Sequence, residues 1–148
     1  MSLKLRLVVM NFMQFFIWGT WLITIGRYWF ETRHWSGTSF GAIFSTMGIA
    51  SLFMPALMGI IADRWVNAER LYGLLHILGG VFLCLLPRAD DPRQFFWLIL
   101  ATMICYMPTI SLAIAVAYNA LKRDGLDVVR DFPPIRVWGT VGFIAALW

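Results

Sequence analysis

The sequence predicts an all-α, polytopic membrane protein built as a bundle of hydrophobic helices. Hydrophobic residues make up 60% of the 148 residues and charged residues 14%, and the mean hydropathy is +0.73. Soluble domains contain roughly a quarter of charged residues, so this composition does not fit a soluble fold. The charged residues also divide the chain into long uncharged stretches, each a candidate for crossing the membrane.

Five uncharged stretches define the predicted helices. A helix needs about 20 mostly apolar residues to cross the hydrocarbon layer, and four of the stretches qualify, the third of them at the short limit of the range. The fifth stops at Trp148, and a helix that ended in mid-membrane would leave carbonyl groups without partners. We therefore expect four full transmembrane helices and the start of a fifth, in a truncated chain. The expected spans are 5–29, 37–62, 70–88, 94–121 and 134–148.

The distribution of Lys and Arg predicts a multi-pass protein of the cell membrane with a cytoplasmic N-terminus. Cytoplasmic loops of membrane proteins carry an excess of basic residues. Most of the 12 basic residues fall on the side of the N-terminus if the spans alternate in direction. They are spread over short loops and form no cluster, so we expect the lipid bilayer as a partner and no nucleic acid. The basic residues on the opposite side are Arg27, Arg33, Arg88 and Arg93.

A short polar motif follows the second predicted helix. Gly59, Asp63 and Arg64 form the pattern Gly-x-x-x-Asp-Arg at the predicted cytoplasmic surface. From the spacing alone these charges are typical of a solvated loop, since surface ion pairs are common and individually weak. The pattern also resembles the signature loop of the major facilitator superfamily, in which the Asp latches the helix bundles in the outward-facing state. The Gly and paired basic residues that follow in that signature are absent here.

A second motif places polar and aromatic side chains on one face of the fifth predicted helix. Its prolines fit the start of a helix, and we expect Asp131 to cap that start. Arg136, Thr140 and Phe143 follow at positions i, i+4 and i+7, which share one helical face. Such a face can donate hydrogen bonds to hydroxyls or carbonyls and stack on a planar ring. The alternative for Arg136, so close to the prolines, is that it reaches back to cytoplasmic water.

The first predicted helix adds two candidate residues to this site. Gln14 and Trp18 lie one turn apart, so that an amide and an indole share one face. Both side chains can line the same cavity as the residues of the fifth helix. Hydrogen bonding between helices is the alternative role for Gln14.

The second motif closely resembles the nucleoside:proton symporter family of the major facilitator superfamily. The resemblance covers essentially the whole chain and implies the N-terminal part of a twelve-helix fold, in which residues 1–148 are a truncated six-helix half. It implies that the missing C-terminal half completes a solute site reached by alternating access. Arg136, Thr140 and Phe143 then become the leading contacts of a nucleoside. The matching segments are Asp-Phe-Pro-Pro-Ile-Arg-Val-Trp-Gly-Thr-Val-Gly-Phe at 131–143, Met54-Pro-Ala-Leu, Ala62-Asp-Arg and Tyr106-Met-Pro-Thr109.

The function implied by this resemblance is nucleoside uptake by proton symport, with the proton as coupling ion and no other cofactor. None of the eight acidic residues lies inside a predicted span. Because a buried carboxylate is the usual proton relay, we expect the coupling residue outside these residues. The alternatives are a transporter of another small polar solute, such as a sugar, and a non-transporting membrane fragment. We expect no enzyme and no metal, because the spans hold no nucleophile with a base and no metal cluster.

Overall fold

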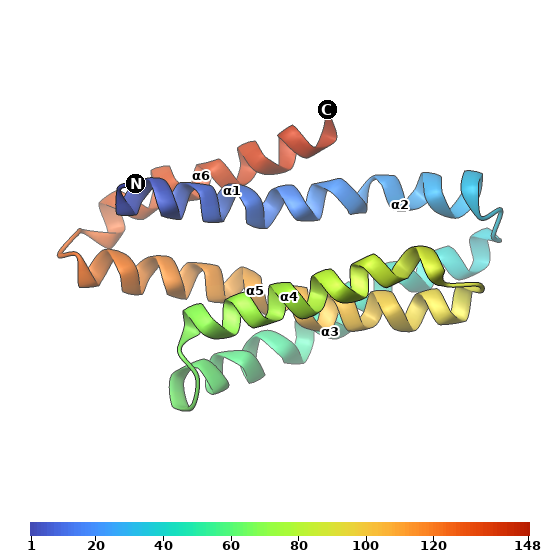
Figure 1. Cartoon of the computed structure of the whole chain (residues 1–148), viewed down its shortest axis with the longest axis horizontal. Coiled ribbons are helices and arrows are strands. Elements are labelled where there is room, and N and C mark those ends of the chain that lie inside the picture. Colours follow the sequence, from blue (N-terminus) through green and yellow to red (C-terminus); the bar gives the residue numbers. More distant parts are fainter. The chain divides into compact units, whose positions relative to one another are not determined.

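The computed structural model describes residues 1–148, and all of its regular elements are helices (Figure 1). Four helical segments are long and apolar enough to cross a membrane. This confirms the predicted all-α membrane bundle with four full spans. The four segments are Leu3–Thr32, Gly37–Arg64, Ala68–Arg88 and Pro92–Arg123.

The first segment is a helix that changes its winding toward its end. Helix α1 (Leu3–Leu22) begins after Ser2, whose hydroxyl caps the first turn. After a turn at Ile23 the chain continues as the short α2 (Thr24–Arg27) and a π-helical turn (Tyr28–Thr32). The wider turn extends the segment beyond residue 29, where the apolar stretch had predicted its end.

The three middle helices agree closely with the predicted spans. The ends of the first and the third lie within two residues of the expected ones, and the second ends three residues before the expected end at residue 88. Charged residues lie close to most of these ends. A short 3-10 turn, Leu86–Arg88, follows the second of them. The three helices are α3 (Gly37–Arg64), α4 (Ala68–Leu85) and α5 (Pro92–Arg123).

The last helix, α6 (Val128–Leu147), begins six residues earlier than the expected start at residue 134. Its cap is Asp127, whose Oδ1 accepts hydrogen bonds from the backbone N–H groups of Val129 and Arg130 at 2.9 and 3.4 Å. The prediction that Asp131 caps this helix is therefore wrong. Asp127 supplies an acceptor one turn earlier, and the two prolines lie inside the second turn of the helix.

The chain divides into two compact units, Met1–Thr32 with Ala113–Trp148, and Arg33–Leu112. In the first unit α1 and α6 lie side by side and run in the same direction (Figure 1). The C-terminal part of α5 packs with both helices around a shared apolar core. That core consists of Leu7, Ala117, Ala120, Leu121, Phe132 and Ile135.

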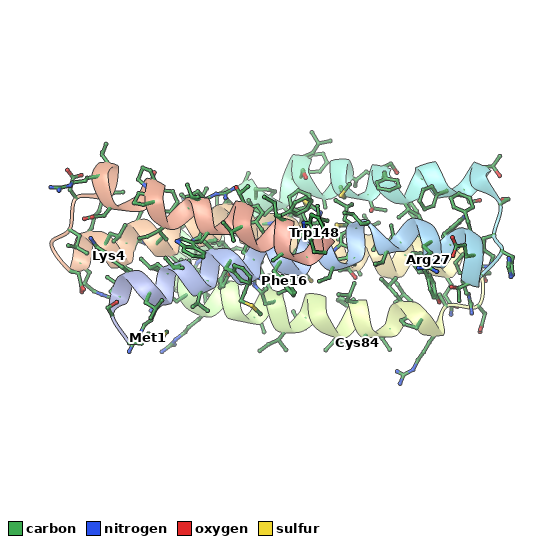
Figure 2. All side chains as sticks on the ribbon, turned by 90° about the horizontal axis from the view of Figure 1, so that it is seen from above. Met1, Lys4, Phe16, Arg27, Cys84 and Trp148 are labelled. Atoms are coloured by element: carbon green, nitrogen blue, oxygen red, sulfur yellow. The ribbon has the colours of Figure 1, made fainter.

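Small residues allow α1 and α6 to approach closely. A Cβ atom on Gly19 would lie 2.7 Å from the Cβ of Ala146, and one on Gly142 would overlap the backbone of Phe12. Near the N-terminal ends of both helices, Lys4 Nζ lies 2.7 Å from Asp131 Oδ1. Lys4 is labelled in Figure 2. The two glycines and the ion pair together define the register in which the two helices meet.

The second unit contains α3, α4 and the N-terminal part of α5. Arg33 precedes α3; its guanidinium carbon lies 4.8 Å from the centre of the Trp35 ring and its Nη2 donates to the carbonyl of Ala89. The Trp35 ring in turn meets Phe95 edge to face at 5.7 Å. These contacts tie the segment before α3 to the segment that leads into α5.

Candidate functional site

A cavity of about 290 Å³ lies in the first unit, where α1 faces α6. Typical small-molecule pockets measure roughly 300–1,000 Å³, so this cavity has the size of a small or partial site. It brings together four of the residues that the sequence selected, Arg136, Thr140, Phe143 and Trp18. The complete lining is Phe15, Trp18, Leu22, Arg136, Thr140 and Phe143.

Arg136 lies well inside α6 and faces this cavity. It follows the first residue of the helix, Val128, by eight positions, which places it about 12 Å along the helix axis. The alternative role for Arg136, in which its side chain reaches back to cytoplasmic water, was based on a helix that starts at residue 134. The observed start at Val128 makes that alternative less favourable. The Arg136 guanidinium carbon lies 4.1 Å from the centre of the Phe15 ring.

The Arg136 guanidinium forms no hydrogen bond or ion pair within this chain. The two ion pairs of the structure join Lys4 to Asp131 and Arg27 to Glu31. A guanidinium has N–H donors on all of its nitrogens and no acceptor. Those donors are therefore available to a solute with carbonyl or hydroxyl oxygens.

Aromatic rings form most of the remaining wall. The Trp18 and Phe143 rings meet edge to face at 6.3 Å and 71°, and the Phe15 and Trp18 rings lie 6.3 Å apart at 38°. Thr140 adds a hydroxyl group on the same face of α6. One cation, one hydroxyl and several rings make a surface that can donate hydrogen bonds to a polar solute and stack on a planar ring.

Gln14 is buried, with 1% of its surface exposed, and is not part of the cavity lining. Its neighbour one turn earlier, Asn11, is equally buried and donates from Nδ2 to the Leu7 carbonyl at 2.9 Å. Two buried amides on one face of α1 are typical of polar packing inside a membrane bundle. A contact between Gln14 and a solute stays a prediction.

The motif Gly59, Asp63 and Arg64 occupies the last turns of α3, in the second unit. Asp63 and Arg64 are exposed, and neither forms an ion pair within this chain. A Cβ atom added at Gly59 would meet no atom within 4 Å, so no helix of this chain packs closely against it. The latch role of these residues stays a prediction.

Phe15 and Leu22 are the lining residues that the sequence did not select. Phe15, Trp18 and Leu22 lie at positions i, i+3 and i+7, which share one face of a helix. This spacing is the signal in the sequence that could have identified Phe15 and Leu22. Sequence reasoning chose the adjacent stripe of Gln14 and Trp18 because it contains an amide. The rotation of α1 about its own axis determines which of the two faces lines the cavity, and it is the face with Phe15, Trp18 and Leu22.

The described residues contain no group of three His, Cys, Asp or Glu side chains placed to hold a metal ion. His76 in α4 has its Nδ1 3.0 Å from the carbonyl of Tyr72, one turn earlier. Such local bonding inside a helix is the ordinary role of a single histidine in a span.

Comparison with known proteins places this chain in a family. The model of the nucleoside H⁺ symporter family matches residues 1–148. The chain belongs to the nucleoside H⁺ symporter family. Among curated members of Escherichia coli (strain K12), the nucleoside permease NupG is 46% identical over 148 residues and the xanthosine permease 49% identical over 148 residues. The putative nucleoside transporter YegT of the same strain is 34% identical over 146 residues.

The match covers 100% of this chain for NupG and the xanthosine permease and 35% of each relative, so the chain spans about a third of their length. The crystal structure of the nucleoside transporter NupG covers 100% of this chain at a TM-score of 0.95 and 46% identity, and 36% of its own chain is matched. A mutant of the same transporter gives a TM-score of 0.96, with 99% of this chain and 37% of that chain covered. Family and fold thus confirm the resemblance expected from the motif at 131–143.

Proposed function

We propose that this chain is part of a cell-membrane transporter that takes up nucleosides together with protons by alternating access. The observation that carries the proposal is the cavity between α1 and α6, where a free guanidinium, a hydroxyl and aromatic rings face one space. The names of the relatives, which include a nucleoside permease and a xanthosine permease, support the solute class. Because the chain spans about a third of their length, it supplies one wall of the site.

A nucleoside offers a planar base, carbonyl or amine groups on its edge, and ribose hydroxyls. In our proposal Arg136 donates hydrogen bonds to oxygen atoms of the base or ribose, and Thr140 donates or accepts one more. Trp18 and Phe143 present ring surfaces on which a base can stack. Arg136 is the single charged residue in the lining, and its N–H groups can donate to the neutral carbonyl and hydroxyl oxygens of a nucleoside.

Proton coupling and the conformational cycle depend on residues outside this cavity. The carboxylate nearest to it along α6, Asp131, is paired with Lys4 at 2.7 Å. We therefore place the proton-coupling group beyond these residues, since a proton relay needs an acid within the transport pathway. Asp63 is exposed with no ion pair in this chain, which supports a latch partner in another part of the transporter. We place the N-terminus in the cytoplasm from the distribution of basic residues.

The proposal is tested by uptake of radiolabelled uridine and adenosine into cells that express the full-length protein containing these residues. We expect uptake above that of cells with empty vector, inhibition by a protonophore, and competition by unlabelled uridine. A hundredfold excess of glucose should leave uptake unchanged, because glucose has no planar ring to stack between the aromatic side chains. Absence of nucleoside uptake, or inhibition by glucose as strong as by uridine, would contradict the proposal.

A further inference from the structure

We infer that Phe15 of α1 is a positioning residue, which holds the Arg136 guanidinium in place at the wall of the cavity. The inference rests on the proposed function, in which Arg136 binds the solute. In this inference Phe15 increases the affinity for the nucleoside through Arg136, without having to contact the nucleoside itself. The contact that carries it is the 4.1 Å separation between the Arg136 guanidinium carbon and the centre of the Phe15 ring.

This ring is the one group of the chain that fixes the charged end of Arg136. The guanidinium has no hydrogen-bond acceptor and no carboxylate partner within the chain. A long side chain without such a partner samples many rotamers, and ordering it on binding reduces affinity. The negative face of an aromatic ring attracts a cation, and more strongly where water is excluded. Phe15 thus orders Arg136 before the solute arrives.

A ring serves this purpose differently from a carboxylate. A carboxylate would accept hydrogen bonds from the guanidinium and occupy the N–H groups that a solute needs. An aromatic face attracts the positive charge without accepting those in-plane hydrogen bonds, because arginine stacks over rings. Arg136 over Phe15 therefore keeps both its charge and its donors.

Gly139 provides a second, independent observation. A Cβ atom at this position would lie 2.7 Å from Nη1 of Arg136 and 2.7 Å from Cδ2 of Phe15. Any side chain there would enter the space in which the guanidinium and the ring meet. The glycine one turn after Arg136 is thus the residue that makes room for this contact across the two helices.

The test compares uridine affinity in purified full-length protein, using variants of Phe15 and of its neighbour Phe16. Phe16 lies on the same helix, stacks on Phe12 at 5.7 Å and does not line the cavity. Phe15→Leu and Phe15→Met keep an apolar side chain but remove the aromatic face, so we expect Kd to rise roughly five- to thirtyfold. Phe15→Tyr keeps the face and should bind within about twofold of wild type, as should the control Phe16→Leu.

A double-mutant cycle separates positioning from a general effect on folding. If Phe15 acts through Arg136, Phe15→Leu should change Kd by less than about twofold in a protein that already carries Arg136→Gln. An undiminished penalty in that background would overturn the inference, as would equal affinities of Phe15→Leu and Phe16→Leu. Wild-type protein that binds no uridine would instead refute the proposed function, so the two failures are distinguishable.

Discussion

The Arg136 guanidinium brings the one charge to the lining of the α1–α6 cavity and has no acceptor for its N–H groups within the chain. Arginine at such a position is expensive in a membrane protein unless it faces a polar cavity or a partner. Its contact with Phe15 and the space left by Gly139 give it a defined place. These features favour a solute-binding role for the Arg136 side chain over the role of a positive charge at the membrane surface.

Replacing Arg136 with Ala should therefore reduce nucleoside uptake by roughly tenfold or more, because hydrogen bonds to a charged group contribute about 1.5–3 kcal/mol. The matched control is Arg130→Ala, which removes an exposed arginine of the same helix that does not line the cavity. Initial rates of uridine uptake are measured at matched surface expression. Equal uptake rates for the two variants would contradict a role of Arg136 in solute binding. Arg136 would then contribute only to the excess of positive charge on the cytoplasmic side.

The cavity-lining residues that the sequence selected most clearly are those whose chemistry is unusual for a membrane span. Arg136 and Thr140 are polar at helical spacing, so the pattern predicted their shared face. Phe15 was missed because an aromatic residue in an apolar span ordinarily faces lipid or a neighbouring helix. Its role depends on the register between α1 and α6, which the close contacts at Gly19 and Gly142 determine.

At the scale of a single element, α6 shows where sequence reasoning about boundaries failed. Two prolines were interpreted as the start of the helix, because proline is favoured in a first turn. In the structure Asp127 caps the helix at Val128, and the prolines remove two hydrogen bonds just past the first turn. The earlier start matters for the site, since it moves Arg136 from the helix end to the helix interior. The boundaries of α3 and α5 were predictable to within two residues because charged residues mark them directly.

Substituting Asp127 with Ala should loosen the first turn of α6. Loss of an N-cap costs about 1 kcal/mol, which corresponds to roughly fivefold faster amide exchange where local opening controls exchange. Hydrogen exchange of the amides of residues 128–132 in the full-length protein measures this effect. Asp124→Ala is the control, because Asp124 lies in the preceding loop and its side chain caps no helix. Unchanged exchange in Asp127→Ala would contradict the assigned start of α6.

At the scale of the whole molecule, the sequence predicted the family and the four full spans because hydrophobic stretches and a specific motif are local signals. The site is not local in this sense. Its wall is made by α1 and α6, which are separated by more than a hundred residues along the chain, as the ion pair between Lys4 and Asp131 illustrates. The cavity is small for a nucleoside site, as expected if segments outside these residues complete it. Proton coupling and the latch at Asp63 belong to that larger assembly in our proposal.

The central claim, that a nucleoside occupies the cavity between α1 and α6, is tested most directly by thiol labelling at Thr140. The full-length protein carries Thr140→Cys with its native cysteines, including Cys84 and Cys105, replaced by Ser, and a maleimide labels it with and without saturating uridine. Val141→Cys is the matched control, since Val141 is exposed on α6 and does not line the cavity. We predict that uridine slows labelling at position 140 severalfold and leaves position 141 unchanged. Equal labelling rates at position 140 with and without uridine would contradict the claim.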